Sequence, residues 1–125
     1  MRFPKLFNTL ANAGASFMAV PAAFTVPTGK AHWHVLLRAR AIETGSFVLA
    51  AAQGGTHECG RATYGHSLVI NPWGEILAEA GEQPEVLVVD IDPALVERDR
   101  TRIPALRNAR EFGLKEVAAA PTSKS

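Results

Sequence analysis

The stretch Phe47-Val48-Leu49-Ala50-Ala51-Ala52 is an unbroken apolar run, and it decides the class of fold. A short run without polar alternation is typical of a β-strand that is covered on both faces, as in parallel sheets. A helical pattern over residues 31–43 precedes the run and stops at Gly45, and a second apolar run, 16–20, precedes that helix. The order strand, helix, strand predicts a βαβ unit and therefore an α/β fold.

The segment before this unit has the pattern of an amphipathic helix. Phe3, Leu6, Phe7 and Leu10 recur at helical spacing, Pro4 suits a first helical turn, and a glycine follows the last periodic residue. We therefore expect a helix from about residue 3 to residue 13 with this apolar stripe in the core.

The segment after the unit alternates turns with short strands. Residues 67–70 and 75–78 flank Asn71-Pro72-Trp73-Gly74, which fits a type I turn and predicts a hairpin. We expect a further strand over 86–91, and Asp92-Pro93 then predicts a helix to about Arg102. Residues 53–65 are polar and glycine-rich, which predicts a long loop of functional interest.

Composition indicates one globular unit and excludes several functions. The 125 residues carry a net charge of +1 and are 47% hydrophobic, which argues against a disordered chain and against a nucleic-acid partner. No apolar run could span a bilayer and the first residues do not resemble a signal peptide, so we expect no membrane partner and a cytoplasmic location. We expect residues 1–112 to form one domain and 113–125 a flexible tail.

Three stretches, taken in order, carry a family resemblance. They are Arg2-Phe3-Pro4, the run from Phe24-Thr25-Val26-Pro27-Thr28-Gly29 through Trp33 to Glu43, and Tyr64-Gly65-His66-Ser67 followed by Asn71-Pro72-Trp73-Gly74. Together they are similar to segments of nitrilase-superfamily carbon–nitrogen hydrolases, most closely the branch that cleaves omega-amides and deaminated glutathione. The order and spacing match to about Phe112.

The resemblance implies a fold and a chemistry. The fold is the C-terminal part of a nitrilase-type α-β-β-α sandwich, and the full-length family forms homo-oligomers. The chemistry is hydrolysis of a non-peptide amide or nitrile of a small carboxylic acid through a glutamate, a lysine and a cysteine thioester, without a cofactor or metal. The family cysteine lies in a Cys-Tyr-Asp-x-Arg-Phe pattern in which Met1 occupies x. We therefore expect a truncated chain that carries none of the three catalytic residues.

Some substrate-binding residues are nevertheless implied by the resemblance. The family's substrate-facing loop corresponds to residues 24–28, where Phe24 would pack on the substrate and Thr28 would donate a hydrogen bond to its carboxylate. Arg61 is a further candidate for binding the anion. The alternative is a catalytically inactive remnant, or an interaction module that pairs with a complete subunit.

Other readings of single residues carry less weight. Cys59, the only cysteine, lies near His57 and His66, but it lacks the elbow of the family nucleophile and the trio supplies only three zinc ligands. We expect a cysteine without special reactivity. Glu43 lies within helical reach of Arg40, which predicts a structural ion pair, and Trp33 is expected to anchor packing, as is Trp73.

Overall fold

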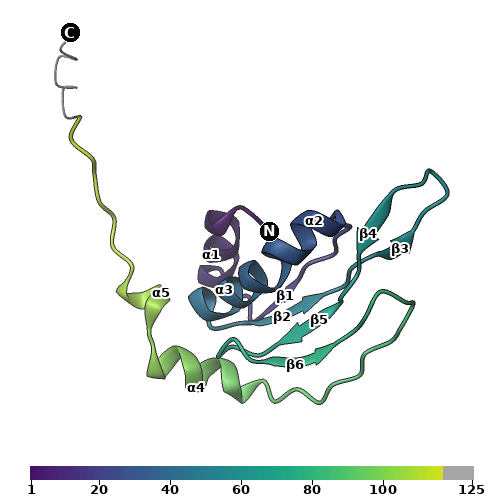
Figure 1. Cartoon of the computed structure of the whole chain (residues 1–125). Coiled ribbons are helices and arrows are strands. Elements are labelled where there is room, and N and C mark those ends of the chain that lie inside the picture. Colours follow the sequence, from purple (N-terminus) through teal and green to yellow (C-terminus); the bar gives the residue numbers. More distant parts are fainter. Residues whose placement is uncertain (117–125) are drawn as a thin grey trace, which may run out of the picture.

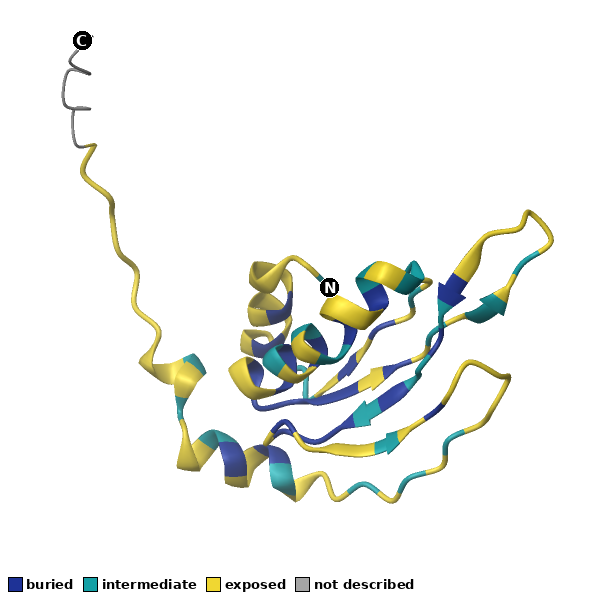
Figure 2. Ribbon diagram, in the orientation of Figure 1, coloured by how far each residue is buried: buried dark blue, intermediate teal, exposed yellow. Residues whose placement is uncertain are grey.

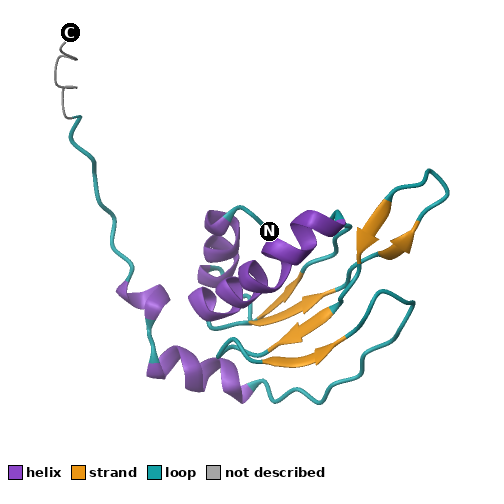
Figure 3. Ribbon diagram, in the orientation of Figure 1, coloured by secondary structure: helices purple, strands orange, loops and turns teal. Residues whose placement is uncertain are grey.

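The computed structural model describes residues 1–116 and contains one mixed sheet with helices on one face (Figures 1 and 3). The strands are β1 (Phe17–Ala19), β2 (Phe47–Ala50), β5 (Leu68–Ile70) and β6 (Ile76–Glu79), in the order β1-β2-β5-β6. β1 and β2 are parallel and the other pairs are antiparallel. The predicted βαβ unit is therefore present, and the α/β class is confirmed.

The crossover between β1 and β2 is a longer helix than the sequence predicted. It comprises α2 (Val26–Thr28), the π-helical turn η1 (Gly29–Trp33) and α3 (His34–Thr44). The predicted turn over 24–29 is thus already helical at Val26, because Pro27 lies in the first turn, where a missing N–H costs nothing. Gly45 ends the helix in the left-handed conformation, with φ of 57°.

The core lies between this helix, α1 (Pro4–Asn12) and one face of the sheet (Figure 2). The helix contributes Trp33, Leu37 and Ala41, which are fully buried, and the sheet contributes alternate side chains. The other face of the sheet is less covered, since Leu49 is 36% exposed. Phe47, on the same face as Leu49, is fully buried, so the prediction that β2 is covered on both faces holds at Phe47 and fails at Leu49 in the described chain.

The predicted helix α1 is present, but its predicted face is wrong. Only Phe7 of the apolar stripe is buried, and it packs together with Ala11, one turn later. Leu6 is 53% exposed, and Phe3 and Leu10 are exposed as well. The helix faces the core through Phe7 and Ala11, which are four residues apart and share one face. The other apolar side chains of the stripe therefore point away from the core.

The hairpin around Asn71 is confirmed. The Gly74 N–H donates to the Asn71 carbonyl (2.9 Å), and Gly74 has a φ of 91°, which favours glycine. The long loop predicted over 53–65 is instead a second hairpin, β3 (Gly54–Thr56) with β4 (Ala62–Tyr64). Strands of three residues that contain glycine carry too weak a pattern to be recognised.

The C-terminal segment departs from prediction in one place. Residues 86–91 form no strand; Val86 is 86% exposed and Val88 90%, because no neighbouring edge pairs with them within residues 1–116. The predicted helix follows as α4 (Ala94–Arg102), with its Ala94 N–H donating to Asp92 Oδ1 (3.0 Å). A short helix, α5 (Ala105–Asn108), comes after it. None of the described helices has the length and apolarity that crossing a membrane requires.

Of the tail predicted over residues 113–125, only 113–116 are described, and these are exposed and belong to no helix or strand. The remainder of that predicted tail lies outside the described residues.

Candidate functional site

The predicted pocket loop, residues 24–28, follows the carboxyl end of β1 and enters the crossover helix. The backbone continues the parallel pairing of β1 with β2 past the end of the strand, since the Ala22 N–H donates to the Ala51 carbonyl (3.0 Å). On its other side the loop meets the second hairpin, where the Tyr64 N–H donates to the Phe24 carbonyl (2.9 Å) and Thr25 forms a bridge with Thr63. Hydrogen bonds thus hold the loop on two sides. It lies at the carboxyl ends of the parallel strands, where α/β proteins bind ligands.

Phe24 lies at the centre of an aromatic and cationic contact. Its ring packs edge-on against Trp33, with ring centroids 5.0 Å apart. The Arg2 guanidinium lies over the same ring, 4.7 Å from its centroid, and one of its nitrogens is 3.5 Å from His32 Nδ1. A positive charge therefore stands directly beside the loop.

The Thr28 hydroxyl is engaged inside the loop. It lies 2.6 Å from the Thr25 hydroxyl and donates to the Thr25 carbonyl (3.2 Å). Donation from Thr28 to a substrate carboxylate, as the sequence predicted, would require this hydroxyl to rotate away from the carbonyl. Each hydroxyl oxygen keeps a lone pair that can accept a hydrogen bond, whereas donation to a ligand requires one O–H to leave its present partner.

Arg61 is placed differently from the other two predicted residues. It is exposed in the turn between β3 and β4, and its carbonyl accepts the His57 N–H (2.9 Å). The cation beside Phe24 is Arg2, which sequence reasoning quoted as part of a motif but did not select as a site residue. Its arrival beside the loop is a tertiary effect, since Arg2 and Phe24 are separated by β1 and α1.

The cluster around Cys59 has no catalytic geometry in the described structure. Cys59 is exposed at the tip of the hairpin, while His57 Nε2 lies 2.7 Å from the Thr63 hydroxyl. His66 is bonded through Nδ1 to the Tyr64 carbonyl (2.5 Å). Within residues 1–116, no three His, Cys, Asp or Glu side chains lie close enough to hold a metal ion.

Of the three remaining structural predictions, two are confirmed. The ion pair between Arg40 and Glu43 is present at 3.0 Å, and Trp33 is a buried anchor as predicted. Trp73 is instead 36% exposed, and its ring contacts Arg102, whose guanidinium lies 4.0 Å from the ring centroid.

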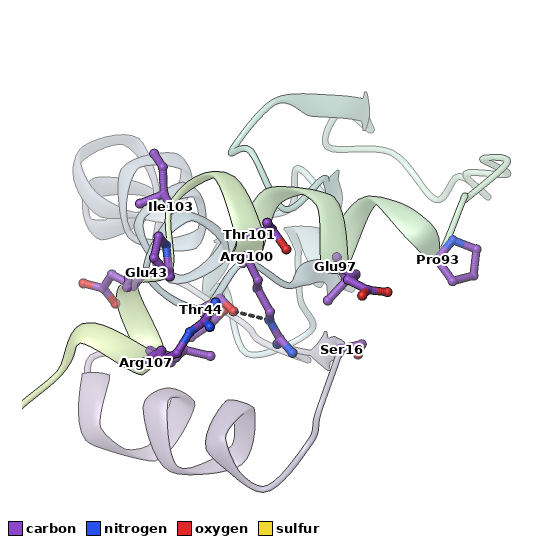
Figure 4. A pocket seen from close by; sticks show the side chains of 14 residues that line it. Ser16, Glu43, Thr44, Pro93, Glu97, Arg100, Thr101, Ile103 and Arg107 are labelled. Carbon is purple, nitrogen blue, oxygen red and sulfur yellow. Dashed lines mark hydrogen bonds between the residues drawn. The ribbon is translucent and has the colours of Figure 1, made fainter.

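A separate cavity of about 430 Å³ lies between the end of α3 and the helices α4 and α5 (Figure 4). Arg100 enters it and donates to the Thr44 carbonyl (3.0 Å), the Ala15 carbonyl (2.8 Å) and the Ser46 hydroxyl (2.9 Å). Burial lowers the pKa of this guanidinium from its ordinary value. Through Nε and Nη2, Arg100 ties α4 to the end of α3 and to the residues that precede β1 and β2, which is a structural role.

Comparison with known proteins decides the family. A family model described as carbon-nitrogen hydrolase matches residues 1–101. The chain belongs to the carbon–nitrogen hydrolase family. This carbon–nitrogen hydrolase sequence is 48% identical to a deaminated glutathione amidase from Synechocystis over 108 residues, which cover 86% of this chain and 40% of that protein.

Solved structures agree on the fold. The Caenorhabditis elegans NitFhit protein has a TM-score of 0.79 at 43% identity, covering 87% of this hydrolase chain and 26% of NitFhit. Saccharomyces cerevisiae Nit3, a member of branch 10 of the nitrilase superfamily, has a TM-score of 0.78 at 39% identity, covering 82% of this chain and 38% of Nit3. The predicted nitrilase-superfamily membership is confirmed. The chain spans 40% or less of each of these relatives.

Proposed function

We propose that this carbon–nitrogen hydrolase chain supplies the substrate-binding loop of an amidase that acts on a small amide bearing a carboxylate. The observation that carries the proposal is the placement of Arg2 over Phe24, beside the hydroxyls of Thr25 and Thr28. An aromatic ring offers an apolar surface to a short carbon chain, and a guanidinium binds a carboxylate through two parallel hydrogen bonds. The relatives named deaminated glutathione amidase support this class of substrate.

The reaction proposed for the complete domain is the one that the family resemblance implies. A cysteine thiolate attacks the amide carbonyl, ammonia leaves with a proton delivered by a glutamate, and a thioester forms. Water, activated by the same glutamate, then hydrolyses the thioester to a carboxylate and frees the thiolate, while a lysine stabilises the oxyanion. The resemblance assigns these three groups to positions N-terminal to Met1. The cytoplasmic location predicted from the sequence and the homo-oligomer implied by the family resemblance belong to the same proposal.

The binding step is tested with a matched pair of charge-removing variants. Glutaramate, a short omega-amide with a carboxylate, is titrated into the protein and into Arg2→Met and Arg61→Met, with the shifts of backbone amide signals as readout. Loss of a charge-assisted hydrogen bond costs about 1.5–3 kcal/mol, so we expect roughly tenfold or greater weakening for Arg2→Met. We expect less than about twofold for Arg61→Met. The reverse ranking would restore Arg61 as the anion-binding residue.

The catalytic step is tested by ammonia release from glutaramate. We expect none from the 125-residue chain, because no attacking thiolate is assigned within it. We expect release when the family's Cys-Tyr-Asp and the stretch with its lysine and glutamate precede Met1, and loss of release when that cysteine becomes alanine. Turnover by the 125-residue chain that disappears in Cys59→Ala would make Cys59 the nucleophile. No turnover from the extended protein would favour an interaction module.

A further inference from the structure

Tyr64-Gly65-His66 carries part of the family resemblance, yet the proposed function assigns it no role. Tyr64 ends β4, and His66 has a φ of 62°, the only non-glycine residue in the left-handed region among residues 1–116. The two rings are stacked, with centroids 3.9 Å apart and planes 21° apart. A left-handed histidine is costly unless its surroundings hold it, so this geometry calls for an explanation.

The contacts of these two residues close a ring that begins and ends at Phe24. The Tyr64 N–H donates to the Phe24 carbonyl (2.9 Å), and the Tyr64 ring stacks on His66. The His66 carbonyl accepts the Trp33 Nε1–H (2.7 Å), and the Trp33 ring packs edge-on against Phe24 at 5.0 Å. The links connect the loop before α2, the end of β4, the segment just after β4 and the end of η1, so these four segments restrain one another.

The backbone of the crossover helix lies directly against the side chain of Tyr64. Gly29 opens the π-helical turn η1, and a Cβ added to it would lie 2.2 Å from Tyr64 Cγ. Only glycine permits the helix backbone to rest against the tyrosine ring at this distance. His34, at the start of α3, meets both rings edge-on at 6.0 Å and bonds Glu79 of β6 through Nε2 (2.6 Å). π-helical turns often occur at functional sites, and this one lies beside the pocket loop.

We infer that Tyr64 and His66 are positioning residues that, with Trp33, fix the pocket loop in its binding conformation before substrate arrives. The inference rests on the proposed function of that loop. Ordering a side chain on binding costs about 0.5–1.5 kcal/mol, so a loop that is already ordered binds more tightly. Breaking the ring should loosen residues 24–28 and weaken glutaramate binding roughly threefold to tenfold, while Arg2 remains in place.

The experiment uses variants that break one link each and matched variants that do not. His66→Gly removes the stacked ring and suits the positive φ, so the backbone keeps its path. Trp33→Phe removes the Nε1–H but keeps an aromatic ring beside Phe24, and Trp73→Phe is the same substitution outside the ring of contacts. Tyr64→Leu removes the stack, whereas Tyr64→Phe preserves it.

Two readouts separate the inference from the proposed function. Backbone ¹⁵N relaxation of residues 25 and 28 reports loop order without a ligand, and glutaramate titration reports affinity. We expect His66→Gly, Trp33→Phe and Tyr64→Leu to lower the order parameters and weaken binding, with Tyr64→Phe and Trp73→Phe unchanged. Unaltered order parameters in the first three variants would overturn the inference, whatever the affinities. If the order parameters fall in these variants but the unmodified protein does not bind glutaramate, the inference about Tyr64, His66 and Trp33 is supported and the proposed function is contradicted.

Discussion

Substitution of Gly29 by alanine should destabilise the protein, against the ordinary preference of a helix for alanine. The backbone of Gly29 is right-handed helical, with φ of −59°, so an alanine there gains about 1 kcal/mol in helix propensity. The new Cβ, however, would lie 2.2 Å from Tyr64 Cγ, 2.3 Å from its Cβ and 2.5 Å from its Cδ2. Carbon atoms pack at about 3.5–4.0 Å, so the tyrosine or the helix must move by roughly 1 Å or more.

The balance of the two effects gives the expected magnitude. Overpacking of this kind costs about 1–3 kcal/mol, and subtraction of the propensity gain leaves a net loss of up to about 2 kcal/mol. For a chain of 125 residues, which lies between the small and the larger domains, that corresponds to a fall in melting temperature of roughly 4 °C for each kcal/mol lost. Thermal unfolding followed by circular dichroism measures it.

Two controls make the prediction specific to the contact with Tyr64. Gly81→Ala adds a Cβ with nothing within 4 Å and should leave the melting temperature nearly unchanged. Tyr64→Ala should not rescue Gly29→Ala fully, because the Cβ of residue 64 remains at 2.3 Å, whereas Tyr64→Gly removes all three of these atoms. If Gly29→Ala melts at or above the temperature of the unmodified protein, the close approach and the reasoning built on it are refuted.

Three further expectations concern stability and reactivity. Arg100→Ala should cost about 2–4 kcal/mol in urea unfolding, because it leaves the Thr44 and Ala15 carbonyls without their donor, and Arg100→Lys should recover only part of this. Asn71→Ala should cost about 1–2 kcal/mol by the same measurement, since Asn71 Oδ1 accepts two backbone N–H groups in the hairpin turn; equal stability would contradict that role. Cys59 is exposed, so the folded protein should react with a maleimide as rapidly as the urea-unfolded chain, and strong protection in the folded state would contradict its placement.

The elements with strong local signals were predictable from the sequence. The apolar run of β2, the turn chemistry of Asn71 to Gly74 and the cap at Asp92 each depend on neighbouring residues, and each is present in the structure. The helix start was misplaced because Pro27 and Gly29 resemble turn residues. The contact that requires glycine at residue 29 is with Tyr64, far along the chain, and no local pattern reveals it.

The faces of the elements were less predictable than the elements themselves. The stripe on α1 and the second face of β2 are apolar in sequence, yet Leu6 and Leu49 are partly exposed in the described chain. Residues 86–91 have the composition of a strand but no paired edge. Periodicity reports which residues can be buried, and only the neighbours present in space determine which of them are.

The candidate site shows the same division. The family motif indicated Phe24 and Thr28, which the structure places on one loop, but whether either binds substrate stays a prediction. Arg2 was missed because its approach to Phe24 depends on how α1 packs against α3. Arg61 was selected, through the family resemblance, as an anion-binding candidate on the polar loop, and the hairpin that carries it was not recognised from the sequence.

The residues that restrain the pocket loop come from a limited part of the sequence. Phe24, Trp33, Tyr64 and His66, which close the ring, all lie between residues 24 and 66, within the βαβ unit and the hairpin that follows it. These contacts are internal to one contiguous segment of the described chain. The exposed apolar side chains of α1 and of the second face of the sheet take no part in the ring. Burial of those apolar side chains against another surface should therefore change the stability of the domain more than the conformation of the loop. The loop is restrained by the contacts among Trp33, Tyr64 and His66.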